Sequence, residues 1–252
     1  MRRGVTPRDG AEPVHWDALV DVCAAGDFRS VHVVAAGPSA KHFIATDDAL
    51  AVTCNDAWAL CRDLPFVYAL ADTYMVRRYL AFGLPTPPIA TVFWAGENGP
   101  PETTETARAF GSYVGRWRRP WPEVFAFRPA PDGLVPEDTA VAVDNATRLT
   151  DDFSVGLSIG PRLMNSGMLA LHVGWILARR LGGLPLHVHG LDLGAGPREY
   201  FDGRRLDRRQ DDIFGDRPRD RTTRILRAMA RHPEVTLHNH SFFRPEVDVD
   251  GE

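Results

Sequence analysis

Small and polar residues stand where four apolar, β-favouring runs of this sequence end. They are Gly37, Pro38 and Ser39 after the first run, Asn55 and Asp56 after the second, Asp72 and Thr73 after the third, and Gly190 and Asp192 after a late one. Backbone N–H groups, hydroxyls and amides gathered at one edge of a sheet are the groups that bind a phosphate or a nucleotide. Turns favour the same residue types for backbone reasons, which is the alternative at any single position. As a set, the residues indicate a nucleotide site.

The first of these turns, Gly37-Pro38-Ser39, is predicted to end a buried strand and to begin a helix. Ser39 is expected to cap that helix, whose first N–H groups and positive dipole end would attract a phosphate. Lys41, the only lysine in the chain, lies in the same turn. It is either a point charge for the phosphate or a solvated helix residue.

Strands and helices that would position these residues alternate along the chain. Strands are expected at 31–34, 49–54, 65–70, 89–94, 123–127, 186–192 and 235–240, and helices at 14–23, 74–82, 103–119, 165–181 and 221–231, with a short helical run after Asn55. Such alternation implies a mostly parallel sheet, because right-handed crossovers place helices on both of its faces. We therefore expect an α/β, Rossmann-like fold whose ligand lies at the carboxyl ends of the strands.

The 252 residues and their 44% hydrophobic content fit a single domain. We expect it to span residues 13–245, with a disordered amino terminus at 1–12 and a flexible tail at 246–252. Irregular insertions are expected at about 129–160 and 194–219, the second of them as a lid over the ligand. The arginines of that lid suit an anionic substrate, whereas the aspartates between them suggest a self-paired surface loop. Those arginines are Arg198, Arg204, Arg205, Arg208 and Arg209.

Charge and hydropathy restrict the partners. A net charge of -4 gives no reason to expect a nucleic acid, and no apolar run reaches the length of a membrane span or a signal peptide. We expect a cytoplasmic protein that contains reduced, mostly buried thiols at Cys23, Cys54 and Cys61. The sequence leaves a homo-oligomer open.

The order and spacing of these motifs resemble the bacterial sialyltransferases of glycosyltransferase family 42, and are similar to the related hydroxymethylpterin diphosphokinase-like proteins that share the Gly-Pro-Ser opening. The likeness runs from about Val31 to about His240 and includes Cys54-Asn55, Asn165-Ser166-Gly167 and Gly190-Leu191-Asp192. It implies that a nucleotide lies across the strand edge. The nucleotide-binding residues would be Gly37, Pro38, Ser39, Asn55, Asp72, Asn165, Ser166, Gly167, Gly190 and Asp192.

The same resemblance implies two catalytic residues. Tyr200 has the offset from Gly190 of a tyrosine that donates to the leaving phosphate, although its ring would equally anchor a loop. Asp216 is the best match to the position of the family's histidine base, and an aspartate is a weaker base unless burial raises its pKa. Gly194 replaces a second phosphate-binding tyrosine and Ala36 a polar residue, which places sialyl transfer in doubt.

The leading hypothesis is an enzyme that transfers a sugar from a nucleotide-activated donor, such as a CMP-sugar, to an acceptor hydroxyl. It would require no cofactor. One alternative is a diphosphokinase-like enzyme that uses ATP and Mg²⁺, with the Asp-rich loop as metal ligands. Another is a nucleotide-binding protein without catalytic activity.

Two histidine pairs, His187/His189 and His238/His240, lie on predicted strands, each pair on one side of its strand. If the two strands were neighbours, four imidazoles would meet and could hold zinc. Structural packing is the favoured interpretation, because no cysteine or carboxylate spacing supports a metal site.

Overall fold

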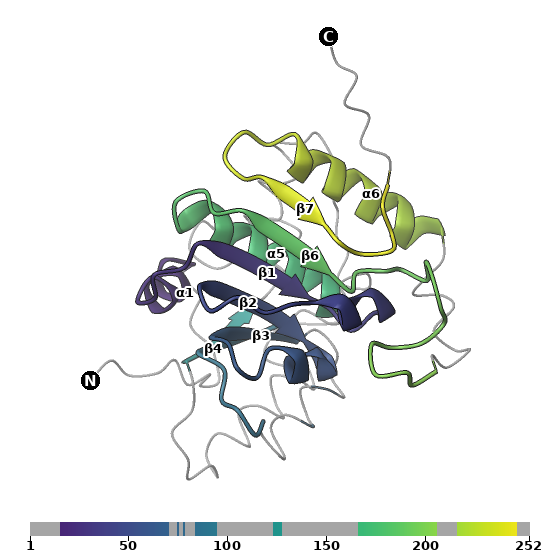
Figure 1. Ribbon diagram of the computed structural model, residues 1–252. Helices are drawn as coiled ribbons and strands as arrows, with labels where there is room; N and C mark the ends of the chain where they lie inside the picture. The colour runs from purple at the N-terminus through teal and green to yellow at the C-terminus, as the bar shows by residue number, and fades with distance from the viewer. Residues whose placement is uncertain are drawn as a thin grey trace, which may run out of the picture.

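The protein is described by a computed structural model, which covers residues 16–70, 75, 78, 84–94, 123–127, 166–205 and 216–245. Seven strands form one sheet in the order β5-β4-β3-β2-β1-β6-β7, and all neighbouring strands are parallel (Figure 1). They are β1 (Ser30–Val34), β2 (Ala49–Cys54), β3 (Phe66–Leu70), β4 (Ala90–Trp94), β5 (Glu123–Phe127), β6 (Leu186–His189) and β7 (Leu237–Asn239). The predicted α/β, Rossmann-like fold is confirmed.

The strand order reverses between β1 and β6. The chain moves outward from β1 through β2, β3 and β4 to β5, and then returns to place β6 on the other side of β1. Val34 of β1 is aligned with His189 of β6, so the loops that follow these two strands leave the sheet side by side. In a parallel sheet, this reversal is where a ligand crevice is expected.

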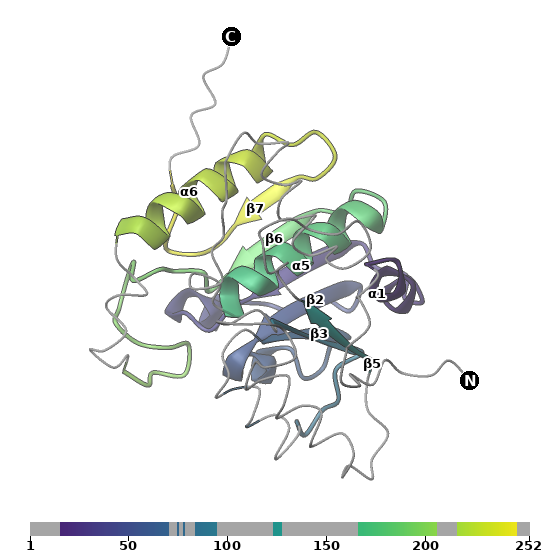
Figure 2. The same cartoon turned by 180° about the vertical axis from the view of Figure 1, so that it is seen from behind.

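Three α-helices cover one face of the sheet: α1 (Trp16–Cys23), α5 (Ser166–Arg180) and α6 (Asp216–Ala230) (Figure 2). The helix α5 is buried along most of its length and packs on β1, β2 and β3. Gly174 permits this approach, because a Cβ there would overlap Cγ2 of Val33. The helix α6 begins at Asp216 rather than at Arg221, so the expected irregular segment ends earlier than predicted.

The opposite face carries two short 3-10 helices, η1 (Pro38–His42) and η2 (Asn55–Leu60). They border a second apolar cluster that includes Val34, Phe66 and Tyr68. The helix that was predicted after Gly37 is present as a 3-10 helix of five residues. Met75 and Arg78 are helical, as predicted, whereas the expected helix at 103–119 lies outside the described residues. So do the insertion expected at 129–160 and both predicted disordered ends.

The three cysteines are buried, as predicted, and burial raises the pKa of the thiols of Cys23, Cys54 and Cys61 to about 12. Within the described ranges, no helix combines the length and the apolar character that crossing a bilayer would need.

Candidate functional site

The carboxyl edge of the sheet, where the parallel strands end, brings together loops from distant parts of the sequence. The helix α5 has its amino terminus at this edge, because its carboxyl end leads directly into β6 at the opposite edge. Its first residue, Ser166, is buried and Gly167 is half-buried. The first backbone N–H groups of α5 therefore lie at the level of the predicted site, at the positive end of the helix dipole.

Ser39 and Asp192 bind each other at the switch between β1 and β6. The Ser39 Oγ donates to Asp192 Oδ1 at 2.6 Å, and the Ser39 N–H donates to Asp192 Oδ2 at 2.8 Å. The Gly190 N–H donates to Ser39 Oγ at 3.0 Å, and the Phe242 N–H donates to Asp192 Oδ1 at 2.6 Å. We call this group the Ser39–Asp192 clasp. Both side chains are almost fully buried, at 1% and 3% exposure.

The two glycines beside the clasp are explained by close contact between the loops. A Cβ on Gly37 would overlap Asp192 Oδ2 and the Gly190 carbonyl, and the Gly37 N–H donates to that carbonyl at 2.9 Å. Gly190 has a φ of +72°, and a Cβ there would overlap the Ala35 carbonyl. These glycines let the backbones of two loops touch each other.

The predicted cap at Ser39 is wrong. Gly37 is the N-cap of η1 and no side chain caps it, because the Ser39 hydroxyl is turned toward Asp192 and Gly190. The Ser39 N–H, which was expected to face a phosphate, is bonded to the Asp192 carboxylate. Pro38 is buried at the start of η1, and Lys41 is exposed. The residues that were predicted to hold a ligand at the switch thus hold one another.

Asn55, at the end of β2, combines an uncommon backbone conformation with a buried polar atom. Its backbone has a φ of +51°, the left-handed region that non-glycine residues rarely adopt. The Tyr68 hydroxyl donates to its carbonyl at 2.9 Å and holds this turn. Its Oδ1 is buried and has no hydrogen-bond partner among the described residues. Asparagine adopts this region more readily than other non-glycine residues, so the buried acceptor without a described partner is the feature that indicates a functional position.

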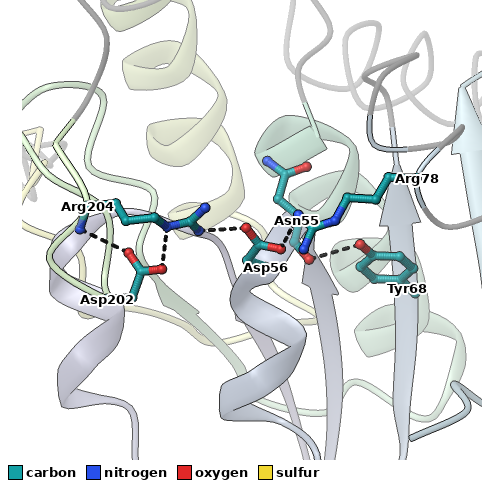
Figure 3. A network of polar contacts seen from close by, with 6 residues as sticks. All are labelled: Asn55, Asp56, Tyr68, Arg78, Asp202 and Arg204. Carbon is teal, nitrogen blue, oxygen red and sulfur yellow. Dashed lines mark hydrogen bonds and ion pairs between the residues drawn. The ribbon is translucent and has the colours of Figure 1, made fainter. Parts of the chain in front are cut away.

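Asp56, the next residue, joins two arginines at the same edge. Its Oδ1 is 2.9 Å from Arg78 and its Oδ2 is 2.6 Å from Arg204. Arg204 also contacts Asp202 at 2.5 Å. Figure 3 shows that the side-chain amide of Asn55 is directed away from these ion pairs and from Tyr68. A guanidinium has five N–H donors, so Arg204 has donors beyond those that bind the two carboxylates.

The loop that carries Tyr200 lies against the turn after β1. The Phe201 N–H donates to the Ala36 carbonyl at 3.1 Å, and Tyr200 packs beside the second apolar cluster. The Arg204 guanidinium lies 5.4 Å from the centre of the Tyr200 ring. Tyr200 is thus close to Asp56 and Arg204, and its half-buried ring also anchors the loop, as the alternative interpretation predicted.

Of the remaining predicted site residues, the structure describes one, Asp216, and leaves two undescribed. Asp216 is the first residue of α6, and the Arg219 Nε donates to the Leu193 carbonyl at 2.9 Å, which fixes that end of α6 at the carboxyl edge. Asp72 and Asn165 lie outside the described residues. Sequence reasoning missed Arg78, whose role depends on the partner Asp56. It also missed the loop at Phe242, which completes the clasp.

In the ranges that the structure covers, no group of three histidine, cysteine or acidic residues has the arrangement of a metal site. Comparisons of the chain with protein-family models, with curated proteins and with solved structures found no match.

Proposed function

We propose that the protein binds a nucleotide-activated sugar at the carboxyl edge, between η2, the amino terminus of α5 and the loop 194–205. The observation that carries this proposal is Asn55, with its left-handed backbone and its buried Oδ1, which has no partner among the residues that the structure describes. An amide oxygen accepts a hydrogen bond, so its partner would be a donor on the ligand. A base amine or a ribose hydroxyl is such a donor, and the helix amino terminus nearby favours the phosphate.

Arg204 and Tyr200 support the phosphate end of this proposal. Arg204 is held in place by Asp56 and Asp202 while other guanidinium donors remain for an anion. A neighbouring tyrosine hydroxyl would stabilise the charge that develops on the phosphate as it leaves. The resemblance to family 42 is the reason for proposing CMP as the nucleotide of the donor.

The proposed reaction is sugar transfer to an acceptor hydroxyl. The bond between the anomeric carbon and the phosphate oxygen breaks, and the nucleotide leaves with the electron pair. The acceptor oxygen forms the new bond to the anomeric carbon and loses its proton to a base, for which Asp216 is proposed. No cofactor takes part in this scheme.

A thermal-shift screen of nucleoside mono-, di- and triphosphates, with and without Mg²⁺, tests the proposal. Stabilisation by CMP or CDP without metal is the expected result, at about 2.7 kcal/mol when the ligand is at a hundred times its Kd. Stabilisation by ATP only with Mg²⁺ would instead indicate the diphosphokinase-like enzyme. No shift with any nucleotide would overturn the proposed site.

Turnover separates an enzyme from a binding protein. If a CMP-sugar binds but is neither transferred nor hydrolysed, and Asp216→Ala changes nothing, the protein is a nucleotide-binding protein without catalysis. If Asp216→Ala abolishes turnover and preserves CMP binding, the proposed base is supported.

A further inference from the structure

Five histidines lie on one face of β1, β6 and β7, opposite the face that α5 and α6 cover. They are His32, His187, His189, His238 and His240, and we call them the histidine stack. Successive rings are nearly parallel, with centroids 4.5 Å apart for His32 and His187, 4.6 Å for His187 and His238, and 4.5 Å for His189 and His240. The two histidine pairs therefore meet, and a fifth imidazole joins them.

The geometry of the stack disfavours two charged rings side by side. His187 Nδ1 and His240 Nε2 are 3.1 Å apart, a hydrogen bond that needs one N–H and one lone pair. Two imidazolium ions would place donors against each other there. His238 and His240 are exposed, so water partly screens charges on them, whereas charges on the buried His32 and His189 would be screened poorly and repel more strongly. His32 and His189 are 7% and 8% exposed, and each has one buried ring nitrogen without a partner among the described residues.

Few charges around the stack offset this repulsion. Within the described residues, Asp48 acts on His32 and raises its pKa, whereas Arg244 lowers the pKa of His240. Phe43 packs edge-on against His32 and His189. Burial, followed by the neighbouring rings, lowers the pKa of His32 and of His187 to about 4 and that of His189 to about 3.

The stack is connected to the clasp through the backbone. The His240 N–H donates to the Val188 carbonyl at 2.8 Å, and the next two residues reach the loop after β6. Ser241 Oγ accepts from the Leu191 N–H at 3.0 Å, and the Phe242 N–H binds Asp192 Oδ1. Since β7 is a three-residue edge strand, these bonds and its pairing with β6 add to the packing of Leu237 and Phe243 on the core in holding this segment.

We propose that the histidine stack is an acid-sensitive latch: when its rings take up protons, their repulsion releases β7 and residues 240–242 from β6 and opens the Ser39–Asp192 clasp. The stabilisation is complete above the unfolded-state pKa of about 6.5 and is lost as the pH falls from there toward 4 and 3. A shared metal ion does not fit, because parallel rings cannot all direct a nitrogen at one point and no described group of three residues suits a metal.

Hydrogen exchange of the full chain tests the latch. Between pH 7 and pH 5, after correction for intrinsic exchange, the amides of His240 and Phe242 are expected to lose at least about tenfold more protection than those of Ala51 and Val52 in β2. Equal loss in both regions, or no loss at β7, would overturn the proposal. His172, a buried histidine of α5 that also titrates below its ordinary range, would affect the core and not β7 selectively.

Two variants connect the effect to the stack. The double variant His187→Gln/His240→Gln should reduce the selective loss at β7 to less than about threefold, whereas Arg62→Gln, at an exposed position in the loop before β3, should leave it unchanged. If the double variant fails to fold, proton NMR titration of the histidine rings in the unmodified protein tests the latch instead. Midpoints of His32 and His189 below pH 5, with release of β7 over the same range, support the latch, and midpoints near 6.5 overturn it.

Discussion

The Ser39 Oγ donates a 2.6 Å hydrogen bond to Asp192 Oδ1, between residues 153 positions apart in the sequence. Both residues were predicted to contact a nucleotide. Instead, their polar atoms form hydrogen bonds that hold two loops together where the strand order reverses. The carboxylate of Asp192 also accepts from the Phe242 N–H, so one side chain ties together the loops after β1, β6 and β7. The candidate ligand site accordingly lies toward β2, at Asn55, whose Oδ1 has no hydrogen-bond partner in the part of the chain that the structure describes.

Replacing Asp192 should destabilise the fold. Asp192→Ala leaves the Ser39 and Phe242 N–H groups without their acceptor in a buried place, and we expect a loss of about 3 kcal/mol. Ser39→Ala preserves the Phe242 bond and should cost about half as much. Urea unfolding measures both values, with Asp63→Asn as the exposed control, which should change stability by less than about 0.5 kcal/mol. A loss below about 1 kcal/mol for Asp192→Ala would contradict the structural role of the clasp.

Substitutions of Asn55 should separate stability from binding. Asn55→Gly suits a φ of +51° and should leave the unfolding free energy within about 0.5 kcal/mol, whereas Asn55→Ala should lower it by about 1 kcal/mol. Both remove the amide, so both should weaken the binding of CMP about tenfold, which is 1.4 kcal/mol. Calorimetric titration of the two variants checks this. If Asn55→Gly binds CMP as the unmodified protein does, the amide has no part in the site.

Arg204 should contribute to anion binding much more than to stability. The Arg204 side chain is about half exposed in its ion pairs with Asp56 and Asp202, so Arg204→Gln should change the unfolding free energy by less than about 1 kcal/mol. The same change should weaken the binding of CDP about tenfold, and Arg204→Lys should recover only part of that loss, because lysine lacks the planar fork. Arg62→Gln, in the exposed pair with Asp63, is the matched control. Equal affinities of Arg204→Gln and Arg62→Gln would remove Arg204 from the site.

The strands followed from the sequence because their signal is local. The predicted bounds of β2 and β5 coincide with the observed Ala49–Cys54 and Glu123–Phe127, and the parallel sheet follows from the alternation of elements. The cap at Ser39 failed because its hydroxyl is bound by Asp192, a partner that no local pattern reveals. A turn sequence specifies that the chain bends, but the fold determines which groups meet there.

The order of the strands in the sheet is the second feature that could not be predicted from the sequence. Each histidine pair was assigned to one side of its strand by the two-residue periodicity, and this holds. That β6 pairs with both β1 and β7, so that His32 joins the two pairs, depends on long-range pairing. The ion pair between Arg78 and Asp56 could not be predicted either, because nothing in the sequence near one residue indicates that the other is its partner.

Gly174 offers a test of how α5 packs on the sheet. In an exposed helix, Gly→Ala stabilises by about 1 kcal/mol, but here the added Cβ would overlap Val33 Cγ2, and overpacking should make Gly174→Ala cost about 1–2 kcal/mol. In a Val33→Ala background the Cγ2 atom that would overlap the new Cβ is absent, so Gly174→Ala should raise the free energy of unfolding by about 1 kcal/mol. Urea unfolding of the four proteins in this cycle gives the coupling energy directly. If Gly174→Ala has the same sign in both backgrounds, the close contact between α5 and β1 is not what requires the glycine.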